Sequence, residues 1–203
     1  MVQIDATAIP DVKLVTPKRF GDHRGFFSET YRADWDLLPE GVVFTQDNHA
    51  FSATPNTIRG LHFQYGPSTQ AKLLRCVVGA ILDVAVDIRK GSPTYGQWVA
   101  EELSAENGRQ LLVPHGFAHA YQTLTPDAHV MYKVDQVYDP QREGAVLWSD
   151  PAIGVEWAKI DAPPQLSNKD EVAPNLQSLD TPFVYDEQAP FHCQCLDRST
   201  ISS

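Results

Sequence analysis

Short apolar segments separated by turn residues recur along the chain, and this spacing limits the folds that it can adopt. The segments expected to form strands lie within 1–15 and at 26–31, 42–48, 58–64, 70–75, 80–88, 97–103, 110–113, 117–124 and 129–138. At least eight short strands, with one short helix before residue 150, indicate an all-β fold. We expect an antiparallel β-sandwich or jelly roll with a few short peripheral helices, not a βαβ fold.

Two short helices are expected outside these strands. The first covers 33–38 and ends before Pro39 and Gly41. The second begins after Ser167, which is a candidate N-cap residue.

The length of 203 residues matches one domain. We expect this domain to span 1–185 and residues 186–203 to form a loosely ordered tail.

Basic side chains are concentrated between residues 58 and 75. This stretch contains Arg59, His62, Lys72 and Arg75, although the formal net charge of the whole chain is −10. Clustered cations in an acidic chain favour a site for an anionic ligand.

The two strands of this stretch, 58–64 and 70–75, are expected to form a hairpin around a turn at 66–68. Because side chains alternate along a strand, His62 and Arg59 are expected on opposite faces. A single histidine between apolar residues is also compatible with a core or surface role without catalysis.

The acidic balance disfavours nucleic-acid partners, since phosphate contacts need a broad basic face. No apolar run approaches the about 18 residues that a membrane span requires. The first residues lack the charged and apolar regions of a signal peptide, and the three cysteines, with Cys193 and Cys195 in a CxC, match no disulfide framework. We therefore expect a cytoplasmic protein with no nucleic-acid or membrane partner.

Motifs of several common chemistries do not occur. The sequence has no GxSxG, P-loop or GxGxxG segment, and it has no HxH pair. His115 and His119 are four residues apart across a Pro-Gly turn, which is a weak metal signal, so we expect neither metal nor another cofactor. Acid–base chemistry by histidine, tyrosine, lysine and carboxylate side chains remains, and it suits proton abstraction next to a carbonyl.

Nine blocks follow one another between about residues 20 and 171: DHRGFFSETY, TQDNHAFS, RGLHFQ, QAKLLR, GAILDVAVDIRKGSPTYGQW, LSAENGRQLLVPHGFAHAYQTL, MYKVDQVY, LWSDPAIGVEW and LSNKD. With these blocks the chain resembles the dTDP-4-dehydrorhamnose 3,5-epimerase family. The resemblance implies an isomerase with a metal-free cupin-type jelly roll, usually a homodimer. Its members convert dTDP-4-dehydro-6-deoxy-D-glucose to dTDP-4-dehydro-L-rhamnose, in dTDP-L-rhamnose biosynthesis, by inverting carbons 3 and 5 next to the keto group.

The resemblance also implies four catalytic residues. His62 in RGLHFQ would be the base, and Asp170 in SNKD would orient it. Tyr132 in MYKV would return a proton from the opposite face, and Lys72 in QAKLLR would stabilise the enolate.

Further positions match substrate contacts in the family pattern. The diphosphate and sugar would be held by Arg24, Arg59, Gln46, Asp47 and Asn48, with other contacts from Glu29, His119, Glu143 and Lys169. Phe20 and Phe26 are candidates to pack on the thymine and to reach across a dimer.

The chain departs from the family pattern near the expected pocket entrance. Ala120 stands for a glycine and Tyr121 for another aromatic residue, Asn56 stands where glycine is common, and 65–69 lacks the usual proline pair. These departures leave open a mono-epimerase of carbon 3 or carbon 5. Two further alternatives are a metal-dependent cupin enzyme that uses His115, His119 and a carboxylate, and a jelly roll that binds nucleotide sugars without catalysis.

Overall fold

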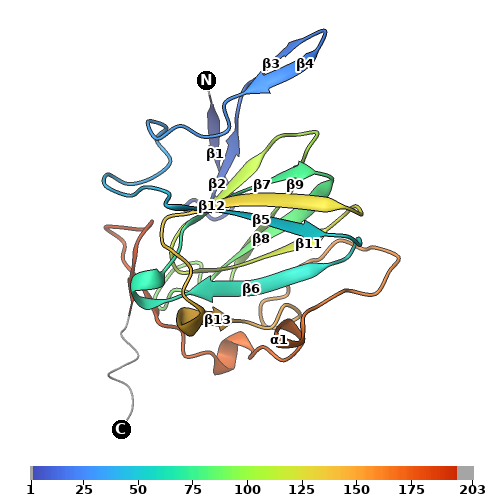
Figure 1. Cartoon of the computed structure of the whole chain (residues 1–203). Helices are drawn as coiled ribbons and strands as arrows, with labels where there is room; N and C mark the ends of the chain where they lie inside the picture. Colours follow the sequence, from blue (N-terminus) through green and yellow to red (C-terminus); the bar gives the residue numbers. More distant parts are fainter. Residues whose placement is uncertain (1, 196–203) are drawn as a thin grey trace.

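Two facing antiparallel sheets form the body of the protein in the computed structural model, which describes residues 2–195 (Figure 1). The six-stranded sheet has the order β1 (Gln3–Ala6), β2 (Lys13–Thr16), β10 (Gln110–Val113), β7 (Lys72–Val78), β12 (Ala128–Val134) and β5 (Gln46–Ser52). The five-stranded sheet has the order β13 (Glu143–Ala145), β6 (Ile58–Gln64), β11 (Phe117–Thr123), β8 (Ala80–Asp87) and β9 (Trp98–Ser104). The predicted all-β jelly roll is confirmed.

Smaller elements lie around these sheets. Strands β3 (Arg19–Asp22) and β4 (Gly25–Ser28) form a separate hairpin, and β14 (Phe183–Tyr185) pairs with β15 (Cys193–Cys195). The helical segments are η1 (Gly66–Ser68), η2 (Pro140–Arg142), α1 (Asn168–Glu171) and η3 (Leu176–Ser178). Among residues 2–195, no helix has the length and apolar character needed to cross a membrane.

The hairpin predicted over 58–75 is wrong. β6 pairs with β11 and β13, whereas β7 pairs with β10 and β12, so the two strands belong to facing sheets. Residue alternation predicts which side chains share a face, but it does not predict which sheet a strand joins. As a result, His62 on β6 and Lys72 on β7 approach the interior from opposite sides.

The helix predicted at 33–38 is also wrong. This segment forms irregular turns, and Leu37 is buried against Leu73 and Leu112 on the outer face of the six-stranded sheet. A six-residue helix ending at a proline gains too few hydrogen bonds to offset its nucleation cost, so packing of the apolar side chains decides the conformation. The predicted N-cap is confirmed, since the Ser167 side chain accepts a hydrogen bond from Asp170 N.

The structure differs from the predicted loose tail in its first part. Arg89 Nη1 donates to Pro190 O at 2.7 Å, His115 N donates to Phe191 O at 3.2 Å, and β15 pairs with β14. Residues 196–203 lie outside the described part of the chain. The domain boundary at 185 stays a prediction.

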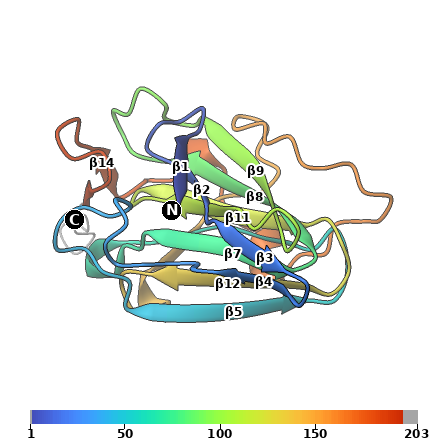
Figure 2. The same cartoon turned by 90° about the horizontal axis from the view of Figure 1, so that it is seen from above.

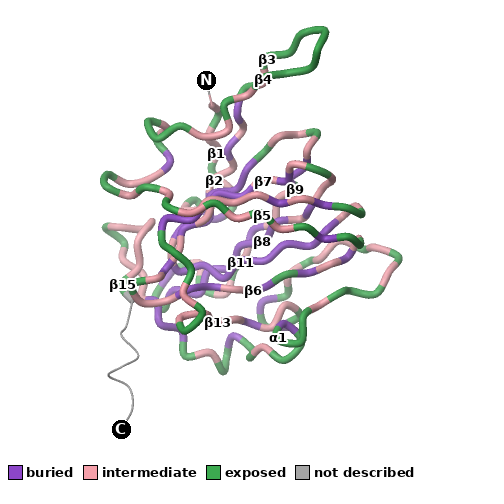
Figure 3. The backbone as a smooth tube through the Cα atoms, viewed as in Figure 1, coloured by how far each residue is buried: buried purple, intermediate pink, exposed green. Residues whose placement is uncertain are grey.

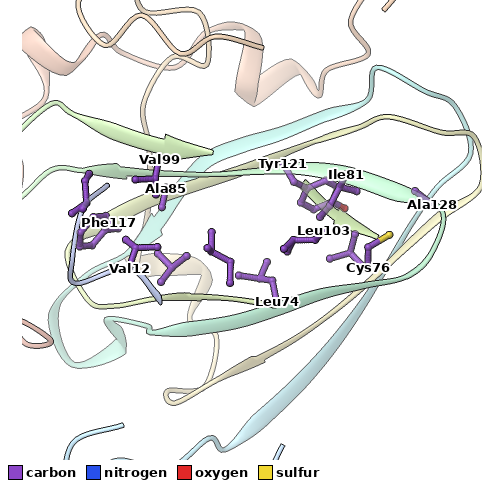
Figure 4. Packing of buried hydrophobic residues seen from close by; sticks show 14 residues of the cluster. Val12, Leu74, Cys76, Ile81, Ala85, Val99, Leu103, Phe117, Tyr121 and Ala128 are labelled. Atoms are coloured by element: carbon purple, nitrogen blue, oxygen red, sulfur yellow. The ribbon is translucent and has the colours of Figure 1, made fainter. Parts of the chain in front are cut away.

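The five-stranded sheet is buried on both of its faces. On β11, Phe117 and Tyr121 point between the sheets, while Ala118 and Ala120 point outward into a second apolar cluster. Figure 4 shows the first cluster, in which Leu74 of β7 lies across the sandwich from Ala85 and Tyr121. Figure 2 shows β7, β12 and β5 side by side in the six-stranded sheet. Because side chains alternate along each strand, every second residue of these strands points into the space between the two sheets, and polar residues at those positions can line a cavity there.

Candidate active site

A cavity of about 520 Å³ opens between the two sheets, and it contains all four predicted catalytic side chains. The five-stranded sheet supplies His62, and the six-stranded sheet supplies Lys72 and Tyr132. Helix α1 supplies Asp170. Arg59, His119, Glu143 and Lys169 of the predicted substrate contacts also line it.

His62 and Asp170 form a hydrogen-bonded pair in this cavity. His62 Nε2 donates to Asp170 Oδ1 at 2.5 Å, and Ser167 Oγ donates to Asp170 Oδ2 at 2.7 Å. Burial alone would raise the pKa of Asp170, but these two hydrogen bonds outweigh it and hold the pKa below its usual value. The ionised carboxylate fixes the imidazole tautomer, so the other ring nitrogen carries the lone pair needed by a base.

Arg59 and His62 both line the cavity, although alternation predicts opposite faces for them. The register of β6 against β11 shifts between His119 and Tyr121, and this irregularity turns both side chains to the cavity. Gly60 lies at the shift with φ of 123°, and a Cβ there would lie 2.4 Å from His119 O. Only glycine allows β11 to approach this closely.

Lys72 faces the cavity near two carboxylates. Burial lowers the pKa of Lys72 to about 8, although the negative charges of Asp83 and Glu143 oppose this shift. A lysine with this pKa is charged at neutral pH and gives up a proton more readily than a solvent-exposed one.

His119 and Asp83 form a second pair, on adjacent strands of the five-stranded sheet. His119 Nε2 donates to Asp83 Oδ1 at 2.7 Å, and both side chains are buried. Burial lowers the pKa of His119 and outweighs the effect of Asp83, so the imidazole is neutral near pH 7. The role of Asp83 was not predicted, yet a carboxylate within the apolar run 80–88 was a visible signal.

Tyr132 lies on the sheet that faces His62. Burial raises the pKa of Tyr132 above its ordinary value, with Arg59 acting in the opposite direction. The phenol therefore keeps its proton at neutral pH and can serve as an acid.

The rim of the cavity carries a further charged group. Lys169 Nζ is 2.8 Å from Glu143 Oε1, and Tyr138 OH donates to Glu143 Oε2 at 3.3 Å. Burial would raise the pKa of Glu143, but Lys169 holds it below its usual value. Tyr138, like Ser167, is a cavity residue that sequence reasoning missed, because nothing distinguishes it from other tyrosines of the strands.

The family model for dTDP-4-dehydrorhamnose 3,5-epimerase matches residues 6–178. The chain belongs to this family. A dTDP-4-dehydrorhamnose 3,5-epimerase of Salmonella typhimurium is 53% identical over 178 residues, which are 87% of this chain and 96% of the relative. The crystal structure of a dTDP-6-deoxy-D-glucose-3,5-epimerase of Legionella pneumophila, in complex with dTDP-4-keto-L-rhamnose, has a TM-score of 0.84 at 41% identity, and the match covers 89% of this chain and 95% of that chain. A 3'-monoepimerase of Streptomyces bikiniensis, in complex with dTDP-quinovose, has a TM-score of 0.79 at 36% identity, covering 85% and 87%.

Three residues taken from the family pattern lie near this cavity or behind it. Gln46 and Asn48 line an adjoining hollow of about 280 Å³, which shares His62, Lys72 and Tyr132 with the main cavity. Asp47, between them, points to the opposite face of β5 and pairs with Lys133 at 2.8 Å.

Four other residues of the pattern, Phe20 of β3 among them, do not line the cavity of this chain. Arg24 lies at the turn of hairpin β3–β4, where its side chain is 77% exposed and pairs with Asp22 at 2.6 Å. Phe26 is on the same hairpin, which projects from the body and is exposed along most of its length (Figure 3). Glu29 follows β4 and lies 3.7 Å from Arg32.

The two histidines of the alternative metal site lie in different surroundings. His119 faces the cavity and bonds Asp83, whereas His115 Nε2 is 2.7 Å from Asp135 Oδ2 and its ring lies beside His192. Among residues 2–195, no three His, Cys, Asp or Glu side chains are grouped so that they could hold a metal ion.

Proposed function

We propose that this protein epimerises dTDP-4-dehydro-6-deoxy-D-glucose at carbons 3 and 5, giving dTDP-4-dehydro-L-rhamnose. One observation supports this reaction above the others: a histidine with the environment of a base and a tyrosine with that of an acid enter one cavity from facing sheets. Inversion of a carbon requires a proton to leave one face and another to arrive at the opposite face. An acid and a base on opposite walls meet this requirement.

The proposed reaction begins at a carbon next to the keto group. His62 takes the proton, and the electrons of the broken C–H bond form a C=C double bond to the keto carbon. The π electrons of the C=O bond move to the keto oxygen, which becomes an enolate oxygen. The Lys72 ammonium, whose charge is retained at neutral pH, stabilises this negative charge. Tyr132 then gives its proton to the other face of the same carbon, and a new C–H bond forms with inverted configuration.

The remaining cavity residues are assigned to substrate binding. Arg59 offers a guanidinium for the diphosphate, and its Nε and Nη2 are already held by Ser52 Oγ and Phe51 O. Neutral His119 and the Glu143–Lys169 pair would contact the sugar. Gln46 and Asn48 would contact it from the adjoining hollow.

We also propose a homodimer in which hairpin β3–β4 of one chain completes the cavity of the other. Phe20, Phe26 and Phe27 on this hairpin are 50%, 59% and 67% exposed, which is unusual for three aromatic side chains beside an arginine. Such rings can stack on thymine, and Arg24 can bind phosphate. The cytoplasmic location expected from the sequence stays a prediction.

A mono-epimerase is the second candidate. The similarity to a 3'-monoepimerase of Streptomyces bikiniensis supports it, since inversion at one carbon needs the same base and acid. Of the two β11 residues that depart from the family pattern, Tyr121 lines the cavity and is a candidate to restrict the reaction, whereas Ala120 points into the second apolar cluster and not into the cavity.

Proton NMR of dTDP-4-dehydro-6-deoxy-D-glucose in deuterated water, with the purified protein and a folded His62→Ala control, tests both proposals. Deuterium at carbons 3 and 5 supports the double epimerase. Deuterium at one carbon moves the assignment to a mono-epimerase. No exchange above the His62→Ala control would refute both.

A further inference from the structure

Asn56 is a buried residue between β5 and β6 that uses all of its polar groups. Its main-chain N–H donates to Thr123 O at 2.8 Å, and its carbonyl accepts from Gln165 N at 2.9 Å. Its side chain donates through Nδ2 to Ala162 O at 2.6 Å and accepts at Oδ1 from Gln122 Nε2 at 2.6 Å. Four partners from two distant segments meet at this one residue.

Gln122 holds the same loop from β11. Its side chain is 1% exposed, and it donates to Ala158 O at 3.0 Å and accepts from Ala158 N at 2.8 Å. The loop 158–165 is therefore bound at two places by two buried amide side chains. Buried amides with all their partners present are rigid, because each lost bond leaves an unpaired polar group in the interior.

This loop leads directly into the wall that carries Asp170. Gln165 O accepts from Ile58 N at 3.0 Å, which attaches the end of the loop to the start of β6. The next residues reach Ser167, which caps α1 and donates to Asp170. The side-chain contacts of Asn56 and Gln122, at Ala162 and Ala158, thus lie eight and twelve positions before the carboxylate that bonds His62.

We propose that Asn56 and Gln122 are positioning residues that hold the loop 158–165 so that Asp170 meets His62. This inference rests on the proposed function for its effect on turnover. Neither side chain lines the cavity, so both act through Asp170 and not on the substrate. The family pattern often has glycine at position 56, and a glycine there could make neither of the two side-chain bonds.

The backbone of Asn56 makes a clean test available. Its φ is 59°, a left-handed conformation that asparagine, glycine and aspartate all tolerate. Asn56→Gly removes both side-chain bonds without backbone strain. Asn56→Asp keeps the acceptor for Gln122 but places an oxygen against Ala162 O, so it should disturb the loop more than glycine does.

The expected order of turnover is wild type, then Asn56→Gly, then Asn56→Asp, with a loss of roughly threefold to tenfold for glycine. The KM for the dTDP-sugar should change less than kcat. Amide hydrogen exchange should rise at 158–171 and stay unchanged in β7 and β12. The low-field NMR signal of the His62–Asp170 hydrogen bond should weaken in the same order.

Asp127→Gly is the matched control. Asp127 also has a positive φ, of 51°, and its side chain is exposed. None of the hydrogen bonds described for residues 2–195 joins this side chain to the loop 158–165. Asp127→Gly should leave turnover and amide exchange within twofold of wild type, a range typical of surface substitutions. Gln122→Met, which removes the other set of bonds without adding charge, is a second variant expected to act like Asn56→Gly.

The outcomes separate this inference from the proposed function. An active wild type with equal kcat and equal imidazole signals in all variants would overturn the positioning role. A wild type that exchanges no substrate proton would refute the proposed function, and amide exchange with the imidazole signal would then decide the positioning role alone. A loss of turnover in the variants with unchanged amide hydrogen exchange at 158–171 would also overturn the positioning role.

Discussion

His62 and Tyr132 line the same cavity from opposite sheets of the sandwich. His62 lies on β6 and Tyr132 on β12, so a flat enolate between them has a base on one face and an acid on the other. The two facing sheets of the jelly roll fix the base and the acid on opposite sides of the cavity. Substitutions of the two residues should therefore have different effects.

Removal of the base should abolish most of the reaction. We expect His62→Ala to lower turnover by about 10²–10⁴-fold, the usual contribution of a general base, with little change in dTDP affinity. Deuterium exchange and calorimetric titration with dTDP measure the two quantities. His129→Ala, on the outer face of β12, should leave both unchanged, and wild-type turnover in folded His62→Ala would contradict the assignment.

Removal of the acid should separate proton exchange from inversion. In Tyr132→Phe, His62 still takes a proton and can return a deuteron to the same face, so label should enter without a change of configuration. Inversion should fall by about 10²–10⁴-fold and exchange by less. NMR resolves label and configuration in one spectrum. Tyr95→Phe is the control, since Tyr95 is exposed and does not line the cavity. An equal loss of both would argue against Tyr132 as the acid.

Turnover should fall as the pH rises through about 8. Burial lowers the pKa of Lys72 to about 8, so the stabilising charge is complete below this pH and is lost above it. The profile of kcat/KM between about pH 6 and about pH 11 shows the decline. Lys72→Arg keeps a charge throughout and should lose this limb, at a lower overall rate. A wild-type decline only near the ordinary lysine value of about 10.4 would show that Lys72 is not the group concerned.

Gly60 should tolerate no side chain. Gly60→Ala places a Cβ 2.4 Å from His119 O and 2.6 Å from the Ala120 Cβ, in addition to the unfavourable φ. Gly25→Ala is a matched control, since Gly25 has a similar φ of 133° and no atom within 4 Å of the added Cβ. Urea denaturation should show a loss of about 1 kcal/mol for Gly25→Ala and of about 3 kcal/mol or more for Gly60→Ala. Equal losses of unfolding free energy in the two variants would mean that the close approach of β11 to Gly60 does not contribute to the cost of the substitution.

The shared site of the proposed dimer can be tested by complementation. Arg24→Ala removes the hairpin contact from one chain, and His62→Ala removes the base from the other. A mixed dimer then has one site with both residues intact, so the refolded mixture should be several times more active than the average of its parents. A mixture no more active than that average would show that each cavity uses only its own chain.

The positions of strands and motifs could be predicted well from the sequence, but the pairing of the strands could not. The turn at 114–116 placed a strand at 117–124, close to the observed Phe117–Thr123 of β11, because turn residues mark the ends of a strand locally in the sequence. The separation of β6 and β7 into two sheets leaves no such local mark, since pairing is decided by contacts between distant segments. His62 and Asp170 are 108 positions apart, and only the family resemblance connected them.

The burial of β11 on both faces has a consequence for how the enzyme can diverge. Its inward positions hold His119 and Tyr121, and the alternate positions hold Ala118 and Ala120 of the second core. Selection for the reaction and selection for stability therefore act on neighbouring residues of one strand, and few substitutions there satisfy both. Changes of substrate among descendants should accumulate in the exposed hairpin and the loops, while the strands themselves evolve slowly.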